Sequence, residues 1–174
     1  MKREVVMPWP LHPEHRTPYV PAIKVKGGTM LFMSGMGPHK PDHKHPHVPE
    51  EWVLPDDAAA QARLVLDKIR RIVEAAGGKF EHIVKITRFL KNIADQDAVN
   101  EVIHEYFGTS LPCSTTVQVS AFVVPTMLIE IDAWAVIPDR TRAAATRPVR
   151  AAPASRAKTR KPIGRGKRRQ RQIR

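Results

Sequence analysis

Residues 129–135, with the sequence IEIDAWA, constrain the fold most, because they alternate between an apolar face and a polar one. A period of two residues predicts a strand with one buried face. Glu130, Asp132 and Trp134 share the face opposite Ile131. Residues 114–121 repeat the pattern, with Val117, Val119 and Ala121 on one face and Ser114, Thr116, Gln118 and Ser120 on the other. Together the two strands predict one apolar face and one polar face with two carboxylates. The plain alternative is that the polar face meets water.

A helical repeat begins after Asp56 and Asp57, two acids that favour a helix N-terminus. Its apolar stripe comprises Ala59, Ala62, Leu66, Ile69, Val73 and Ala76, and Gly77-Gly78 ends it. A second helix is predicted over about 95–107, and strands over 19–26, 29–34 and 82–90, with a hairpin at Gly27-Gly28. This order predicts an α+β fold: one sheet with two helices on a single face, covering Val117 and Ile131.

Charge divides the chain into two parts. Residues 140–174 contain fourteen Lys or Arg and no acid, whereas the preceding residues have fifteen Lys or Arg against seventeen Asp or Glu. We therefore predict three segments: an irregular, proline-rich segment 1–18, a folded domain 19–138 and a disordered basic tail 139–174. The tail either binds the phosphates of nucleic acid without sequence preference, or only keeps the protein in solution.

The cellular setting is indicated by what the sequence lacks. Cys113 is the single cysteine, so no internal disulfide forms. No apolar run reaches the roughly 20 residues of a membrane span, and residues 1–15 lack the apolar core of a signal peptide. We expect a cytoplasmic protein without a membrane partner.

Several segments carry a family resemblance. PCSTTVQV at 112–119 and IEIDAWAVIP at 129–138 resemble the C-terminal signature of the RidA/YjgF family, and similar matches occur at TPYVPA (17–22), LFMSGMGP (31–38), QARLVLDKIRRIVEAAGG (61–78), IVKITRFLKNI (83–93) and AVNEVIHEYFG (98–108). The resemblance implies a chorismate-mutase-like fold and a homotrimer with a central barrel. It also implies hydrolysis of an enamine or imine metabolite in a cleft between subunits, without a cofactor.

The resemblance assigns roles to individual residues. Glu130 matches the family carboxylate that positions the attacking water, and Tyr19 matches a tyrosine that lines the cleft. Ser114 stands where the deaminating members have a substrate-binding arginine, next to Cys113 and close to Thr116 in the expected substrate-binding wall. A serine hydroxyl cannot replace a bidentate guanidinium on a substrate carboxylate. The imine deaminase activity is therefore in doubt.

Three other features have competing interpretations. Arg88, in an otherwise apolar strand, is either a substitute cation or, as we favour, a surface arginine that extends its charge into water. Cys113 has no nearby histidine in sequence to act as a base, so we do not expect it to be a nucleophile. His39, His43, His45 and His47 are spaced loosely among prolines, and we favour a polar loop over a metal site.

Three functions remain open at this point. The first is an enamine or imine hydrolase, the second a trimer that binds a small metabolite without turnover, and the third a protein associated with nucleic acid through its basic tail. Ser114 bears on the choice between the first two, and the charge of residues 140–174 supports the third.

Overall fold

The computed structural model describes residues 1–9, 16–44, 46 and 48–139. The chain divides into two units, Met1–Thr141 and Arg142–Arg174. All of the described residues belong to the first unit. The predicted basic tail lies, apart from Asp139, outside the described residues.

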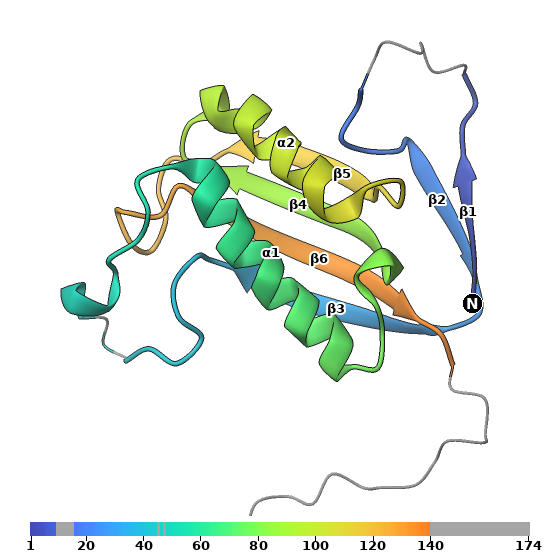
Figure 1. The fold of residues 1–174 in the computed structure, drawn as a ribbon, viewed down its shortest axis with the longest axis horizontal. Coiled ribbons are helices and arrows are strands. Elements are labelled where there is room, and N and C mark those ends of the chain that lie inside the picture. The colour runs from blue at the N-terminus through green and yellow to red at the C-terminus, as the bar shows by residue number, and fades with distance from the viewer. Residues whose placement is uncertain (10–15, 45, 47, 140–174) are drawn as a thin grey trace, which may run out of the picture. The chain divides into compact units, whose positions relative to one another are not determined.

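The order of elements in the first unit agrees with the α+β prediction (Figure 1). The strands are β1 (Lys2–Val6), β2 (Ala22–Lys26), β3 (Thr29–Met36), β4 (Ile83–Leu90), β5 (Cys113–Gln118) and β6 (Ile129–Ile137). The helices are α1 (Ala58–Ala75) and α2 (Gln96–Phe107), with short 3-10 turns at Pro49–Glu51, Phe80–His82 and Ile93–Asp95. The expected order of strands and helices is therefore confirmed from β2 onward, whereas β1 was not predicted.

A mixed four-stranded sheet forms the centre of this unit, in the order β3-β6-β4-β5. The strands β4 and β5 are parallel, whereas β6 is antiparallel to both of its neighbours. Both helices lie on one face of the sheet, as predicted (Figure 1). The opposite face carries no helix from the described part of the chain and is called the open face below.

The N-terminal strands differ from the prediction. The strand β2 pairs with β1, from Lys2 opposite Lys26 to Val6 opposite Ala22, so the expected hairpin between β2 and β3 is wrong. Residues 2–6 also form a strand within the segment that we expected to be irregular. Gly27 and Gly28 have φ angles of 74° and 94°, and they redirect the chain instead of closing a hairpin. The Gly28 N–H donates to the Asp139 carboxylate at 3.1 Å, which ties this turn to the residues after β6.

The helix α1 forms for the reasons that the sequence suggests. The Asp57 carboxylate caps it by accepting from the Ala59 and Ala60 N–H groups at 2.9 and 3.3 Å. Four members of the predicted stripe are fully buried against the sheet: Ala62, Leu66, Ile69 and Val73. No helix among the described residues is long and apolar enough to cross a membrane.

Gln61 connects α1 to the segment that leads into β6. Its buried side-chain amide donates to the carbonyls of Pro55 and Thr126 at 2.6 and 2.9 Å, and its side-chain oxygen accepts from the Leu128 N–H at 2.8 Å. These bonds satisfy three backbone groups that would otherwise be costly to bury. They fix the chain immediately before Glu130.

Candidate functional site on the open face

The strand β6 has the predicted alternation. Ile129, Ile131, Ala133 and Ala135 are completely buried beneath the helices. Glu130, Asp132 and Trp134 project from the open face, where they pair in register with Phe89, Thr87 and Lys85 of β4. Trp134 also meets the side chain of Phe32 from β3 edge to face, with 5.5 Å between the ring centroids.

The two faces of the strand β5 are exchanged relative to the prediction. Ser114 pairs with Ile86, and Thr116 pairs with Arg88. Because Ile86 and Arg88 are buried on the helix face and paired residues share a face, Ser114 and Thr116 also point to the helix side. The open face instead receives Cys113, Thr115 and Val117.

The expectation that Val117 packs under the helices is therefore wrong, and Ser114 does not share a face with Glu130. The side chain of Val117 is 40% exposed, as its place on the open face requires. The physical reason is that β5 is an edge strand of mostly small polar residues. Alternation alone does not fix which of its faces is buried, and a shift of one residue exchanges the two faces.

Glu130 is the half-buried carboxylate of the open face. It forms no hydrogen bond or ion pair with the described residues, so its oxygens remain available as acceptors. A Cβ atom built on Gly35 would overlap the Glu130 carboxylate. The absence of a side chain at Gly35 thus gives Glu130 its position beside β3.

Two other charged groups of the open face are already held by the protein. Asp132 Oδ1 accepts from the Thr87 N–H at 2.9 Å. Lys85 Nζ donates to Thr115 Oγ1 at 2.7 Å and to the Ile86 carbonyl at 2.8 Å. Partial burial lowers the pKa of the Lys85 ammonium, against the opposing effect of Asp132. Sequence reasoning missed Lys85, although its period-two spacing to Thr87 and Phe89 places it on this face.

Arg88 fits neither interpretation that the sequence offered. It is 3% exposed and lies on the helix face, where its Nη1 donates to Asn100 Oδ1 of α2 at 2.7 Å. Burial lowers the pKa of the guanidinium to about 10. Arg88 is therefore neither a surface arginine nor a cation on the face of Glu130.

The start of β5 gathers other predicted site residues. The Val20 N–H donates to the Pro112 carbonyl at 3.1 Å, which holds the segment of Tyr19 next to Cys113. Arg3 of β1 reaches the same place, and its Nη2 donates to the Leu111 carbonyl at 2.6 Å. Burial lowers the pKa of the Arg3 guanidinium. Sequence reasoning could not find Arg3, because its strand was not recognised.

The described subunit does not bring Ser114 and Glu130 together. Ser114 aligns through Ile86 with Ala133 of β6, three residues from Glu130. Three residues along a strand span about 10 Å, and the two side chains leave opposite faces of the sheet. A cleft that contains both side chains therefore requires a second subunit.

The histidine loop forms an aromatic cluster in its described part. The ring centroid of His39 lies 4.6 Å from that of His43 and 4.9 Å from that of the buried Trp52. His45 and His47 lie outside the described residues. Within the described ranges, no group of three or more His, Cys, Asp or Glu side chains is arranged to hold a metal ion.

Comparisons with known proteins agree on one family. The family model described as Endoribonuclease L-PSP matches residues 11–137. The 3-aminoacrylate deaminase RutC of Acinetobacter baylyi is 37% identical over 131 residues, which are 75% of this chain and 95% of that protein. The 2-iminobutanoate/2-iminopropanoate deaminase of Escherichia coli K12 is 37% identical over 122 residues, 68% of this chain and 87% of that protein.

Solved structures show the same relationship. The YjgF gene product of Escherichia coli has 36% identity and a TM-score of 0.53, covering 71% of this chain and 91% of its own. A Rid-family protein of Yersinia pestis, YyfB, has a TM-score of 0.65 and covers 79% of this chain and 100% of its own. At 22% identity, YyfB supports the fold alone.

Substitutions can test how the buried hydrogen bond between Arg88 and Asn100 contributes to stability. Asn100→Leu leaves a buried guanidinium without its acceptor and should lower the free energy of unfolding by about 3 kcal/mol. Arg88→Met removes the charge together with its need for a partner and should be neutral or stabilising. In the double variant, the cost of Asn100→Leu should largely disappear. Urea unfolding measures all three, and a larger loss for Arg88→Met than for Asn100→Leu would contradict the assignment.

Proposed function

Because the chain belongs to the RidA/YjgF family, we propose that it forms a homotrimer that binds a small imine or enamine between neighbouring subunits and hydrolyses it there. The observation that carries this proposal is the half-buried Glu130 carboxylate, whose oxygens accept no hydrogen bond from the described residues and which lies against Gly35 on the open face. Two curated relatives with 37% identity are named as deaminases of such compounds, which supports the same reaction class.

The reaction needs one group that both accepts and returns a proton. Water must add to the carbon of the C=N bond, after an enamine has gained a proton at carbon and lost one from nitrogen to become an imine. Glu130 takes a proton from the attacking water as the C–O bond forms and gives it to the nitrogen, which leaves a carbinolamine. Glu130 then takes the hydroxyl proton and passes it to the nitrogen, so that the C–N bond breaks, ammonia leaves and a carbonyl compound remains. A carboxylate without another partner is suited to this exchange.

Two subunits complete the proposed cleft. Since Ser114 and Glu130 leave opposite faces of one sheet, we assign the substrate-binding wall to the start of β5 in the neighbouring subunit. Tyr19 and the open-face Cys113 form its surface, and Ser114 and Thr116 lie behind them on the helix side of the strand. The Val20–Pro112 hydrogen bond supports placing Tyr19 in the same wall as Cys113. Catalysis would then depend on assembly.

The open face supports the proposed assembly, because it exposes an apolar patch. Met30 is 45% exposed, Phe32 66%, Val117 40% and Trp134 44%, and register places all four on this face. Exposed apolar clusters of this kind mark interaction surfaces. A threefold arrangement of these faces would form the central barrel that we propose.

A charge in this patch tests the trimer. Trp134→Glu should convert the trimer to monomers at micromolar concentration, because association would bury three unpaired carboxylates. Sedimentation velocity measures the change. Val53→Glu is the matched control, since Val53 is 88% exposed and lies in a loop away from the sheet. A wild-type monomer, or a Trp134→Glu trimer, would show that the open face is not the interface.

Activity variants test the chemistry separately. We expect weak hydrolysis of 2-iminobutanoate and 3-aminoacrylate, since both carry a carboxylate and Ser114 offers it no charge. Glu130→Gln should lower the rate by about a hundredfold without dissociating the trimer. Ser114→Arg should raise kcat/KM by about tenfold through a charged bidentate contact, whereas the uncharged Ser114→Gln should not. Ammonia release measures the rates.

The outcomes separate the first two functions. An unchanged rate in Glu130→Gln would exclude that residue as the proton-transfer group. Saturable binding of these compounds without ammonia release would instead favour the non-catalytic metabolite-binding trimer. A wild-type rate that Ser114→Arg does not increase would mean that the chain uses another cation.

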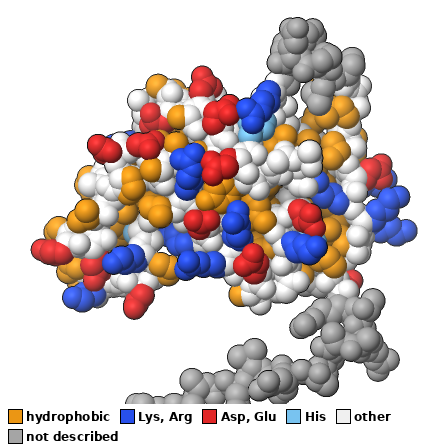
Figure 2. Space-filling view, in the orientation of Figure 1, with side chains coloured by type: hydrophobic (Ala, Val, Ile, Leu, Met, Phe, Trp, Pro, Cys, Tyr) orange, Lys and Arg blue, Asp and Glu red, His pale blue; other side chains and the backbone are white. Residues whose placement is uncertain are grey.

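A second candidate function rests on the segregation of charge. In Figure 2, Lys and Arg are interspersed with Asp and Glu over the helix face of the first unit. The fourteen Lys or Arg of residues 140–174 have no acid among them. We propose that this segment binds nucleic acid through phosphate contacts, without reading bases.

Truncation tests this second function. The cut belongs after Asp139, because Asp139 accepts from Gly28 N–H and Thr29 Oγ1 at 3.1 Å each and its loss would disturb the fold. The truncated protein should lose duplex binding and keep its oligomeric state. For the full chain, the slope of log K against log salt should be about −0.9 for each phosphate neutralised. The same affinity and slope after truncation would refute the role of the tail.

A further inference from the structure

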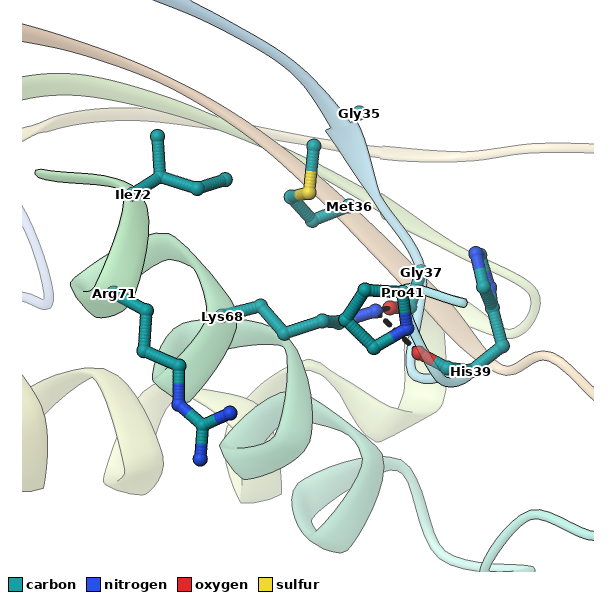
Figure 3. Close-up of a pocket in the computed structure, with 8 residues that line it drawn as sticks. All are labelled: Gly35, Met36, Gly37, His39, Pro41, Lys68, Arg71 and Ile72. Carbon is teal, nitrogen blue, oxygen red and sulfur yellow. Dashed lines mark hydrogen bonds between the residues drawn. The ribbon is translucent and has the colours of Figure 1, made fainter. Parts of the chain in front are cut away.

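A cavity of about 350 Å³ lies on the helix side of the sheet, between α1 and the chain that follows β3 (Figure 3). We call it the Lys68 pocket; the lining residues that matter here are Met36, His39, Pro41, Lys68, Arg71 and Ile72. Its volume is within the range of small-molecule sites. Lys68, Arg71 and Ile72 share one face of α1, because they are spaced three and four residues apart.

The charged groups of the Lys68 pocket are basic. Lys68 extends toward the loop, where its Nζ donates to the carbonyls of Gly37 and, at 2.6 Å, of His39 (Figure 3). An ammonium has three donors, so one remains for a ligand. The Arg71 guanidinium forms no hydrogen bond or ion pair within the described residues. None of the residues that line the pocket is acidic.

The rest of the lining determines which anion fits. Met36, Pro41 and Ile72 are the apolar side chains of the lining; Pro41 lies beside the Lys68 ammonium, whereas the Arg71 side chain points away from Met36 and Ile72 and would have to turn to reach a ligand there (Figure 3). Partial burial lowers the pKa of the Lys68 ammonium, so a bound anion would favour its charged form. A ligand that brings one negative charge and a short apolar body satisfies both features. A fully hydrated polyanion would leave the apolar wall unused.

We propose that the Lys68 pocket is a second ligand site that takes a small apolar monocarboxylate. The carboxylate binds Lys68 and Arg71, and the apolar body packs on Met36 and Ile72. Gly35 lines this pocket and also lies against the Glu130 carboxylate, but the two sites face opposite sides of the sheet, because Met36 pairs with the buried Ile131 whereas Glu130 projects from the open face. Binding should therefore be the same in Glu130→Gln, whatever the outcome for hydrolysis.

Hexanoate serves as the probe, with the full chain in its native assembly. Calorimetric titration should show saturable binding at millimolar concentration. Hexanamide, of nearly the same shape but neutral, and inorganic phosphate, charged but without an apolar body, should each bind about tenfold more weakly. In NMR spectra of methyl-labelled methionines, the Met36 signal should shift, whereas that of Met30 on the open face should not.

Charge variants provide the decisive comparison. Arg71→Glu changes an exposed side chain and should weaken hexanoate binding by about tenfold or more, and Lys68→Met should do the same. Arg70→Met is the matched control on the same helix, since the Arg70 guanidinium lies over the Phe80 and Tyr106 rings, 5.3 and 4.9 Å from their centroids. It should leave binding unchanged.

Several outcomes would overturn the proposal. One is hexanoate binding in Arg71→Glu that equals the wild type, and another is hexanamide binding as tight as that of hexanoate. Equal losses in Arg71→Glu and Arg70→Met would indicate general charge attraction instead of a site. Absence of any Met36 shift at saturation would place the carboxylate elsewhere. Because Arg71 contributes no hydrogen bond to the described fold, its variant does not depend on the loop contacts of Lys68.

Discussion

The burial of one side of β6 determines the positions of the other functional groups. This strand lies between β3 and β4, and four of its alternate side chains are completely buried beneath the helices. A slip by one residue would expose all four and bury Glu130 and Asp132 in their place. The cost of such a slip fixes the register, so Glu130 must project from the open face. The Gln61 hydrogen bonds to Thr126 and Leu128 then set where along the sheet this strand begins.

The same physics explains which predictions succeeded. The β6 alternation and the α1 stripe are strong patterns, because burial on one side demands them. The strand β5 carries small side chains on both faces and pairs with a neighbour on one side only. The sequence therefore did not show which of its two faces is buried. Arg88 was wrongly predicted to lie at the surface for a related reason. Its acceptor, Asn100, is twelve residues away on α2, and no sequence pattern connects the two residues. The strand β1 was missed since its partner, β2, had been assigned to a different hairpin.

The separation of Ser114 from Glu130 links the proposed chemistry to assembly. In the proposed mechanism, one subunit would present the proton-transfer group Glu130 and a neighbour the binding wall, because Ser114 and Glu130 leave opposite faces of one sheet. The apolar side chains of Phe32 and Trp134 lie on the face that would bring such a neighbour close to Glu130. On this view, the aromatic pair and the carboxylate serve a single requirement. If both proposals hold, the residues that join the subunits would also determine whether water and substrate meet at Glu130.

The distribution of cations then suggests which ligands each surface favours. Around β5, Lys85 is held by Thr115, Arg88 by Asn100 and Arg3 by the carbonyl of Leu111. Each of these groups already donates a hydrogen bond to the protein, although the Nε atoms of Arg3 and Arg88 are buried without an acceptor among the described residues, and moving any of the three to a substrate carboxylate would break an existing bond. Arg71, which also lines the Lys68 pocket, forms no hydrogen bond or ion pair within the described part of the chain. Under the two proposals, the open face would suit an imine or enamine of low charge, and the helix side a carboxylate. If Ser114 stands where the resemblance implies an arginine, the cleft would select a different ligand, and anion binding would be kept at the separate Lys68 pocket.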